Sequence, residues 1–344
     1  MNEKRTTIQD IAREAGVTKA TVSMVVNNDS RITEATRLKV MEVVRKLHYV
    51  PNDSARKLAR GKTDILAVLS PRFTSPFVSA FLEVVEQRAF HTGRYDHGIQ
   101  PFTTRNVSAD LDELMKRILY GHQADAVILI TQAPLPENVR EYRRMGLPLI
   151  LVENNQADTH SVCYDNVQGA RQAVTHLLKR GRKRIGLIVG SQIAKEGKDL
   201  NPSALERMKG YVEALKAHGV AFEPARVVEV RKYEYEEGRE CLRRILDRGV
   251  KMDALFCAAG DIVAMGVLEE ARISGLSIPK DLAVVGYDDV QAARILNPAL
   301  TTVRQSFLEL GIRAFDIAMD AIDGRLKEPC QIVLQQELVV RESS

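Results

Sequence analysis

The amino-terminal part of the chain carries hydroxyl and amide side chains that suit phosphate oxygens. They are Thr18, Thr21, Ser23, Asn27, Thr33 and Thr36. Hydrogen bonds from such groups fix the register of a protein on duplex DNA without reading its sequence. Residues 1–62, called the head, also hold thirteen basic and seven acidic residues, a balance of +6, against 36 and 38, or −2, in the remainder. This distribution favours binding to a polyanion, although a solvated charged surface has the same composition.

A second set of polar and aromatic side chains follows apolar segments further along the chain. It comprises Ser70-Pro71-Arg72-Phe73, Glu153-Asn154-Asn155, Tyr164-Asp165, Gly260-Asp261 and Tyr287-Asp288-Asp289, with Arg207 starting a helix after the loop that holds Asn201 and Ser203. Taken singly, each residue is equally well explained by capping, a turn or solvent exposure. Their shared position at the ends of predicted strands favours contact with a ligand, because α/β proteins bind ligands there.

No spacing typical of an enzyme or metal site accompanies these residues. The chain lacks G-x-S-x-G, H-E-x-x-H and G-x-G-x-x-G, and Gly190–Lys198 is too long for a phosphate-binding loop. The seven His are scattered, and the four Cys lie far apart without a C-x-x-C pair. We therefore expect no catalysis, no cofactor and no metal, although Asp288-Asp289 leaves an α/β enzyme as a minor alternative. The cysteine usage fits the cytoplasm.

Length and composition indicate a multidomain globular protein. At 344 residues the chain is long enough for two or three domains, and its 45% hydrophobic and 27% charged residues are ordinary for a soluble fold. No apolar run approaches the roughly 18 residues of a membrane span, and the amino terminus lacks the apolar stretch of a signal peptide. No membrane association is expected.

The head is predicted to contain three short helices. The first opens at Thr7 and stops at Gly16, and Thr18 caps the second, whose Val22, Val25 and Val26 face inward. The short glycine-containing turn between them is typical of a helix-turn-helix. Thr33 caps a third helix from Glu34 to Leu47, with an inner stripe of Leu38, Met41, Val44 and Leu47. A generic three-helix bundle is the alternative.

The second helix of a helix-turn-helix enters the major groove through its amino-terminal residues. Its predicted exposed residues are Lys19, Ala20, Thr21, Ser23 and Met24. Beyond the third helix, Pro51 prevents helix continuation and Asn52 can cap a new short helix. Leu58 lies there between basic residues and could wedge into a minor-groove base step. The alternative is a linker leucine covered by the rest of the chain.

From Ile65 onward, short apolar strands alternate with amphipathic helices. The predicted strands are Ile65–Leu69, Asp96–Ile99, Ala126–Ile130, Leu149–Val152, Ser161–Tyr164, Arg184–Val189, Arg226–Glu229, Ala254–Cys257 and Leu282–Tyr287. This alternation predicts parallel sheets covered by helices. There are too many units for one sheet, and Leu147–Val167 is a natural changeover between two halves. Two facing α/β sheets would place a ligand in the cleft between them.

Two stretches of the head are specific enough to suggest a family. They are Thr7-Ile8-Gln9-Asp10-Ile11-Ala12-Arg13-Glu14-Ala15-Gly16-Val17-Thr18-Lys19-Ala20-Thr21-Val22-Ser23, followed by Val25-Val26-Asn27, and Tyr49-Val50-Pro51-Asn52-x-x-Ala55-Arg56-x-Leu58. Both resemble the LacI/GalR family of bacterial transcription regulators. The resemblance implies a homodimer on a pseudopalindromic double-stranded DNA operator. It also implies a hinge helix that orders on DNA and inserts Leu58 into the minor groove, with Thr7, Asn52, Ala55 and Arg56 as further contacts.

The rest of the chain resembles the same family in four places. They are Glu206-Arg207-Met208-Lys209-Gly210-Tyr211, Val284-Val285-Gly286-Tyr287-Asp288-Asp289, Leu300-Thr301-Thr302-Val303-Arg304-Gln305 and Leu338-Val339-Val340-Arg341-Glu342-Ser343. The resemblance implies a periplasmic-binding-protein-like body of two Rossmann-like subdomains, with Arg207, Asp288 and Gln305 as effector ligands. A planar Arg and an acceptor Asp suit vicinal hydroxyls. Arg72, Phe73, Tyr164 and Ser203 complete the expected effector set.

The chain departs from the family pattern at Met24 and Gly260. Met24 stands where a basic, base-reading residue is common, and methionine cannot form a bidentate pair with guanine. Gly260 stands where an Asn commonly precedes the Asp. Arg72 together with Arg207 could favour an acidic ligand such as a uronate. Aromatic stacking partners are limited to residues such as Phe73 and Tyr164, because the chain has no Trp.

These observations predict an α/β protein with an N-terminal helix-turn-helix head. We expect a DNA-binding domain at 1–50, a hinge at 51–62 and an effector-binding and dimerisation domain at 63–344. Its N-subdomain is expected at about 63–163 and 306–334, and its C-subdomain at about 164–305 and 335–344. The expected function is an effector-controlled, sequence-specific transcription regulator, most simply a repressor, whose small polar effector is a sugar or sugar derivative. The alternative is a cytoplasmic solute-binding or sensing protein that does not bind an operator.

Overall fold

The computed structural model describes residues 6–26, 29–49, 61–94, 98–104, 108–190, 202–230 and 232–344. The chain divides into two compact units, Met1–Thr63 and Asp64–Ser344. The first adds only Thr63 to the predicted head and keeps that name, and the second is called the body. Predictions for seven residues lie outside the described residues: Asn27, Pro51, Asn52, Ala55, Arg56, Leu58 and Asn201. The predicted hinge is described only at residues 61 and 62.

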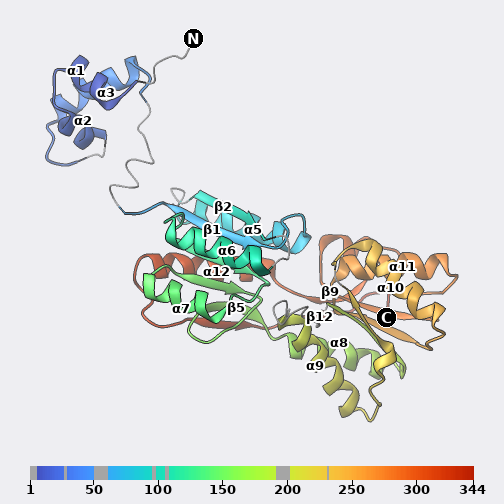
Figure 1. The fold of residues 1–344 in the computed structure, drawn as a ribbon. Helices are drawn as coiled ribbons and strands as arrows, with labels where there is room; N and C mark the ends of the chain where they lie inside the picture. Colours follow the sequence, from blue (N-terminus) through green and yellow to red (C-terminus); the bar gives the residue numbers. More distant parts are fainter. Residues whose placement is uncertain are drawn as a thin grey trace. The chain divides into compact units, whose positions relative to one another are not determined.

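The head folds into three helices, α1 (Ile8–Ala15), α2 (Lys19–Val26) and α3 (Glu34–Lys46), within its described residues (Figure 1). Thr7 caps α1, and Gly16 ends that helix with a left-handed φ of 63°. The Thr18 hydroxyl accepts the Thr21 backbone N–H at 3.1 Å and so caps α2. The predicted helix-turn-helix is therefore confirmed.

The head core is small and lies between the three helices. Its buried residues are Ile11, Ala12, Ala15, Val22, Val25 and Val40. The predicted inner stripe of α3 is wrong at Leu38, which is 59% exposed, whereas Val40 is fully buried. The prediction stepped by three residues, but a helix turns every 3.6 residues, so the buried line runs through Val40, Val44 and Leu47.

The amino-terminal half of the body is built on a parallel sheet with the order β11-β5-β4-β3-β1-β2, called sheet A. Its strands are β1 (Ile65–Ser70), β2 (Gly98–Thr103), β3 (Ala126–Ile130), β4 (Leu149–Val152), β5 (His160–Tyr164) and β11 (Gln331–Leu334). One face packs on α5 (Pro76–His91) and α12 (Phe307–Ile322), the other on α6 (Ser108–Tyr120) and α7 (Pro136–Met145). Leu66 and Val68 of β1 face the first pair, Ala67 and Leu69 the second, as strand alternation requires.

The carboxyl-terminal half is built on sheet B, with the order β12-β10-β9-β8-β6-β7. Its strands are β6 (Ile185–Gly190), β7 (Val227–Val230), β8 (Ala254–Cys257), β9 (Ala283–Asp288), β10 (Thr301–Arg304) and β12 (Glu337–Val339). One face is covered by α8 (Asn166–Lys179) and α9 (Pro202–Ala217), the other by α10 (Tyr235–Asp247) and α11 (Asp261–Ile273). Two short 3-10 turns, η2 (Pro224–Arg226) and η3 (Gln291–Arg294), lie in its loops.

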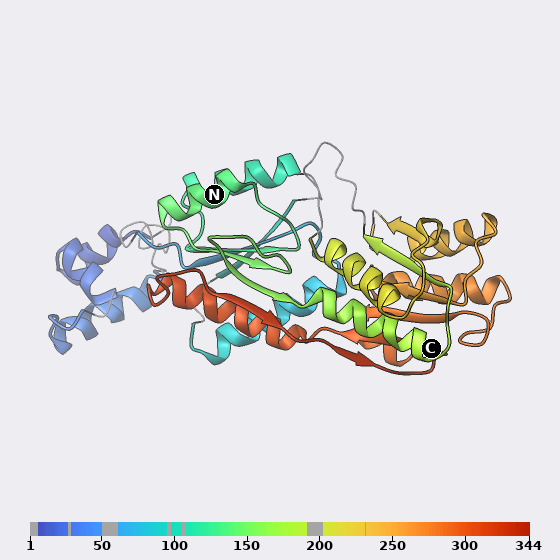
Figure 2. The ribbon, with the colours of Figure 1, turned by 90° about the horizontal axis from the view of Figure 1, so that it is seen from below.

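The described residues pass between the two sheets three times, and these connections can be followed in Figures 1 and 2. The first connection runs from β5 through Asp165 and includes Asn166, the residue at which α8 begins. The second runs from β10 to α12 through Gln305 and Ser306. The third runs from β11 to β12 through Gln335 and Gln336. The two halves of the body are therefore held together by short crossing segments, which also carry polar side chains.

The predicted α/β architecture is confirmed, but several elements were not predicted. The helix α7 and the strands β10, β11 and β12 were not predicted, and β12 pairs with β10 antiparallel rather than parallel. The edge strands β11 and β12 are short and partly exposed, which weakens their hydrophobic pattern. The second predicted strand, Asp96–Ile99, overlaps the observed β2 only at Gly98 and Ile99. Within the described residues, no helix combines the length and apolar character needed to span a membrane.

Candidate functional site

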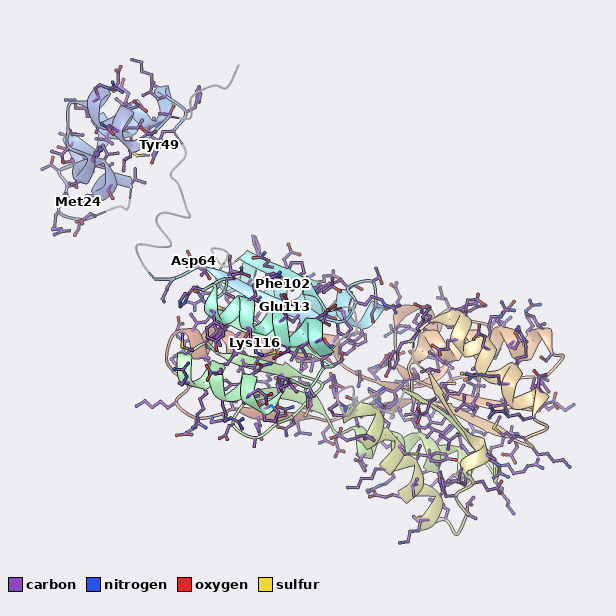
Figure 3. All side chains as sticks on the ribbon, viewed as in Figure 1. Met24, Tyr49, Asp64, Phe102, Glu113 and Lys116 are labelled. Carbon is purple, nitrogen blue, oxygen red and sulfur yellow. The ribbon has the colours of Figure 1, made fainter. Side chains whose placement is uncertain are left out.

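The outer side of α2 is available for contact with a ligand. Val22 and Val25 are buried against the other helices of the head, which fixes the orientation of α2. Lys19 and Ala20 are exposed, and Met24 is partly exposed on the same helix. Figure 3 shows Met24 on α2 and Tyr49 on a different side of the head. The structure therefore presents the predicted base-facing residues on a rigid support.

Two of the predicted phosphate-contacting hydroxyls, Thr18 and Thr33, cap helices in this structure, as does Thr7. Thr7 and Asp10 form a reciprocal capping box, and the hydrogen bond from Thr7 lowers the pKa of Asp10. The side-chain oxygens of Thr18 and Thr21 lie 2.9 Å apart, and those of Thr33 and Thr36 are equally close. These pairs are exposed at the amino termini of α2 and α3, where a helix favours anions. Capping and phosphate contact are compatible at such positions.

Two of the predicted effector residues of the body, Asp288 and Gln305, lie around a third, Arg207. This residue lies in the second turn of α9 rather than at its start, because α9 begins at Pro202. Its Nε donates to Asn166 Oδ1 at 2.8 Å and its Nη1 to the Ala258 carbonyl at 2.8 Å. The guanidinium carbon also lies 3.7 Å from the centre of the Tyr287 ring. Arg207 is thus a buried cation held by several elements of sheet B and its helices.

Asp288 and Gln305 complete this polar network. With its amide oriented to suit its neighbours, Gln305 donates to Asp288 Oδ1 at 3.3 Å and accepts from Arg207 Nη2 at 3.3 Å. Burial raises the pKa of Asp288 to about 7, against the opposing effect of Arg207. Asp288 also has a φ of 111°, a conformation that side chains rarely adopt. The predicted trio Arg207, Asp288 and Gln305 is therefore brought together.

All three crossing segments contribute a side chain to the network around Arg207. Asn166 comes from the first connection, Gln305 from the second and Gln336 from the third. The Tyr287 hydroxyl lies 3.1 Å from Asn166 Oδ1 and 2.8 Å from Gln336 Oε1. The Gln336 amide also donates to Gln305 at 3.0 Å. A ligand that competes for these hydrogen bonds therefore acts directly on the segments that join the two halves.

Glu153, which the sequence placed only in the general group of strand-end residues, is a member of the site. It follows β4 with a positive φ of 57° and is almost fully buried. Its carboxylate accepts the Tyr164 backbone N–H at 3.1 Å and lies 3.8 Å from Arg207 Nη2. Its backbone carbonyl accepts the Ser203 hydroxyl at 3.1 Å. Burial raises the pKa of Glu153, while Arg207 counteracts this effect.

The remaining predicted effector residues lie in different surroundings. The Tyr164 ring is buried and its hydroxyl donates to the Ser306 carbonyl at 2.8 Å, while Phe73 packs on the sheet A core. Arg72 forms an ion pair at 2.7 Å with Glu234, which precedes α10 in the other half of the body. The Arg72 guanidinium is thus paired with a carboxylate of the other half. Among the described residues, it makes no hydrogen bond or ion pair with the network around Arg207.

Tyr233 is an aromatic side chain that the sequence did not suggest for the site. It is 41% exposed and its hydroxyl lies against Gly190, the last residue of β6. It also contributes to the electrostatic environment of Arg207. The signal that could have found it is its position three residues after Val230, where β7 ends. Tyr233 places a partly exposed ring beside the polar network.

Gly260 and Asp261 have structural roles. Gly260 has a φ of 109°, and a Cβ there would lie 2.8 Å from Asp288 Oδ2, so the glycine leaves space for that carboxylate. The Asp261 carboxylate accepts the Thr302 hydroxyl at 2.7 Å and the Val290 N–H at 2.9 Å. Asp261 therefore ties α11 to sheet B. The described residues contain no group of His, Cys, Asp and Glu that could hold a metal ion.

Comparison with known proteins assigns both units of the chain. Residues 7–52 match the model of bacterial regulatory proteins of the lacI family, and residues 174–344 match a periplasmic binding protein-like domain. The HTH-type transcriptional regulator CelR of Thermobifida fusca is 33% identical, over 99% of this chain and 98% of that protein. The chain belongs to the lacI family of bacterial regulatory proteins. This confirms the family suggested by the head and body motifs.

Solved structures of the lacI family support the same fold. The transcriptional regulator CelR–cellobiose complex has a TM-score of 0.73 and 30% identity, covering 99% of this chain and 100% of that one. The lac repressor dimer bound to operator and the anti-inducer ONPF has a TM-score of 0.85 at 24% identity, covering 99% of each chain. The chain is thus a lacI-family transcriptional regulator. Its relatives are regulators rather than enzymes, which confirms the expectation that it is not an enzyme.

Proposed function

We propose that this lacI-family regulator is an effector-controlled, sequence-specific DNA-binding repressor that acts in the cytoplasm. Two copies of the chain form a homodimer whose α2 helices enter successive major grooves of a pseudopalindromic operator. Residues 1–50 read the operator, residues 51–62 form the hinge, and residues 63–344 bind the effector and the second copy. Repression is the simplest outcome, because a dimer bound to both half-sites occupies DNA that the polymerase requires.

The effector is a small polar molecule, a sugar or sugar derivative, bound where the two halves of the body meet. The network of Arg207, Asp288, Gln305 and Asn166 offers planar donors and acceptors that suit vicinal hydroxyls. Tyr233 adds a partly exposed ring that can stack on the apolar face of a sugar. Glu153 and Asp288 both face Arg207, so a neutral polyhydroxylated ligand fits this charge balance better than a uronate.

One observation carries this proposal: the side chains that hydrogen-bond around Arg207 come from the segments that cross between the two halves. Asn166, Gln305 and Gln336 lie in the three connections between the halves and hydrogen-bond within one cluster. A ligand that binds this cluster differently in two arrangements of the halves shifts the population between them. We propose an N-subdomain at about 63–163 and 306–334 and a C-subdomain at about 164–305 and 335–344, and the membership of the strands in the two sheets supports this division. Movement of these subdomains would change the spacing of the paired hinges.

Two measurements on the full chain test the proposal. Selection from a pool of random duplexes is expected to enrich a pseudopalindrome, bound with an affinity that falls steeply as salt rises. A thermal-shift screen of neutral sugars, sugar acids and nucleobases is expected to find a neutral sugar that raises the melting temperature. That sugar should also change operator affinity. Failure to enrich any duplex, with and without the sugar, would refute the repressor assignment.

The alternative is a solute-binding or sensing protein that no longer binds an operator. The apolar Met24 on α2 favours this alternative, since a base-reading helix usually carries hydrogen-bonding side chains. Under this alternative, removal of residues 1–60 leaves the function of the protein intact. Under the favoured proposal, the same deletion leaves ligand binding unchanged but abolishes binding to the selected duplex.

A further inference from the structure

The outer face of α2 is apolar at its centre. Each residue of a helix is rotated by about 100° from the last, so Ala20 and Met24 lie almost above one another, about 6 Å apart along the axis. They lie on the side opposite the buried Val22 and Val25. Lys19 and Ser23 flank this pair. A helix selected only for surface contact with water would place polar side chains at its most outward positions.

The orientation of this apolar pair is fixed by the rest of the head. The Thr18 hydroxyl caps the start of α2, and the Met24 carbonyl accepts the Asp29 N–H at 2.9 Å at its end. Arg37 of α3 in turn donates to the Asp29 carbonyl at 2.8 Å. The side chains of Ala20 and Met24 therefore cannot rotate inward without disrupting both ends of the helix. Whatever α2 binds meets this apolar surface.

We infer that Ala20 and Met24 read the methyl groups of thymines, so that each operator half-site presents A·T pairs beneath them. This inference rests on the proposed function, which places α2 in the major groove. The thymine 5-methyl is the apolar group that base pairs offer in that groove. A G·C pair at the same place would bury polar base edges under Met24 without a partner, which carries a free-energy penalty. Lys19 is left to contact guanine or phosphate at the neighbouring positions.

The spacing of the two side chains limits where the thymines lie. About 6 Å along the helix corresponds to one or two base-pair steps of about 3.4 Å when the helix follows the groove. The two thymine methyls are therefore expected within two steps of each other in each half-site. The sequence preference at these positions should be for A·T over G·C.

Replacement of thymine by deoxyuridine tests this contact directly, because it removes the methyl group and leaves base pairing unchanged. The full chain is first used to select a duplex, and each thymine of one half-site is then replaced in turn. We expect one or two closely spaced positions at which the replacement weakens binding about fourfold, the effect of losing one buried methylene-sized group. Other positions should change by less than about twofold.

Variants at Met24 assign the sensitive position. Met24→Ala should weaken binding to the thymine duplex and remove the effect of deoxyuridine at one position, as a double-mutant cycle requires for a direct contact. Met24→Arg should shift the selected base pair at that position from A·T to G·C. Met145→Ala, at a partly exposed methionine of the body, is the matched control and should change neither. If Met24→Ala impairs folding of the head, the deoxyuridine scan of the unaltered chain still decides the question.

The outcomes separate this inference from the proposed function. A selected pseudopalindrome that is sensitive to deoxyuridine at closely spaced positions supports both. A selected pseudopalindrome with G·C pairs facing α2, or without sensitivity to deoxyuridine at any thymine, overturns thymine reading and leaves operator binding standing. Failure to select any duplex overturns the proposed function itself.

Discussion

The head and the body place their candidate functional groups in opposite ways. In the head, a small buried core holds α2 in place, and Lys19, Ala20 and Met24 lie on the outside. In the body, Gln305 is buried and hydrogen-bonds both Arg207 and Asp288, which are themselves only partly exposed. The groups proposed to contact DNA can therefore change with little effect on folding, whereas the groups proposed to contact an effector also stabilise the fold.

This difference has a physical basis in solvation. An exposed side chain on α2 is hydrated until DNA replaces the water, so its replacement leaves no buried group without a partner. Arg207 has lost its water and depends on Asn166, Ala258 and its carboxylate neighbours for compensation. Coupling between stability and binding is thus expected in the body and not on the outer face of α2.

Loss of Arg207 should produce the largest effect. Arg207→Ala leaves the buried carboxylates of Glu153 and Asp288 without their cation, so we expect the free energy of unfolding to fall by about 3–5 kcal/mol. The effector-induced rise in melting temperature should also disappear. Urea denaturation and thermal shift measure both effects. Arg171→Ala, at an exposed pair with Glu213, is the control and should cost less than about 1 kcal/mol. Equal losses in the two variants would contradict the proposed coupling.

A cavity in the head core should affect DNA binding alone. Ile11 is fully buried among the three helices, and Ile11→Ala is expected to destabilise the head by about 2–5 kcal/mol. Operator binding should be lost, while the melting response of the body to its effector persists. Leu38→Ala, at an exposed position of α3, should remain within about 0.5 kcal/mol of the unaltered chain. Loss of the effector response in Ile11→Ala would show that the two regions are not separable in this way.

The pH dependence of the free energy of unfolding should reveal the raised pKa of Asp288. Its pKa is raised from the ordinary 3.8 to about 7 in the folded chain, so folding takes up a proton between these values. The resulting destabilisation is absent below about pH 4, grows as pH rises and is complete above about pH 7. Asp288→Asn removes this contribution, so its urea midpoint should decline less steeply between pH 5 and pH 8.

The ion pair between Arg72 and Glu234 should have the smallest effect on stability. Both side chains are about 40% exposed, so Arg72→Ala should cost no more than about 1 kcal/mol. Because the pair joins the two halves, the variant should nevertheless release a bound effector faster, which stopped-flow fluorescence can measure. Exchange of the charges in Arg72→Glu with Glu234→Arg should restore the slower release. An unchanged release rate in Arg72→Ala would show that this ion pair does not help to retain a bound effector.

The predictions from sequence were correct where the interactions join residues that are close together in the chain. The caps at Thr7, Thr18 and Thr33 and the stop at Gly16 depend on contacts within four residues, and all four were predicted correctly. The alternation of strands and helices in the body was also predictable. Leu38 was placed wrongly because a three-residue step approximates the helical period too coarsely between Leu38 and Leu47.

The family motifs led to Arg207, Asp288 and Gln305, and Glu153 was named only in the general group of strand-end residues. The sequence did not lead to Asn166, Gln336 or Tyr233. Their roles depend on contacts between distant parts of the chain. The Ser203 hydroxyl meets Glu153 across 50 residues, and Tyr287 meets Gln336 across 49. Glutamine and asparagine are also common on surfaces, so their types carried no signal of burial.

The sequence by itself determined the three helices of the head, the α/β body and the family, because these follow from local capping, hydrophobic periodicity and recognisable motifs. Only the tertiary structure decided that the segments crossing between the two sheets supply Asn166, Gln305 and Gln336 to one buried network around Arg207. The physical reason is that a buried charge must find its hydrogen-bond partners among groups that folding brings together, wherever they lie in the chain.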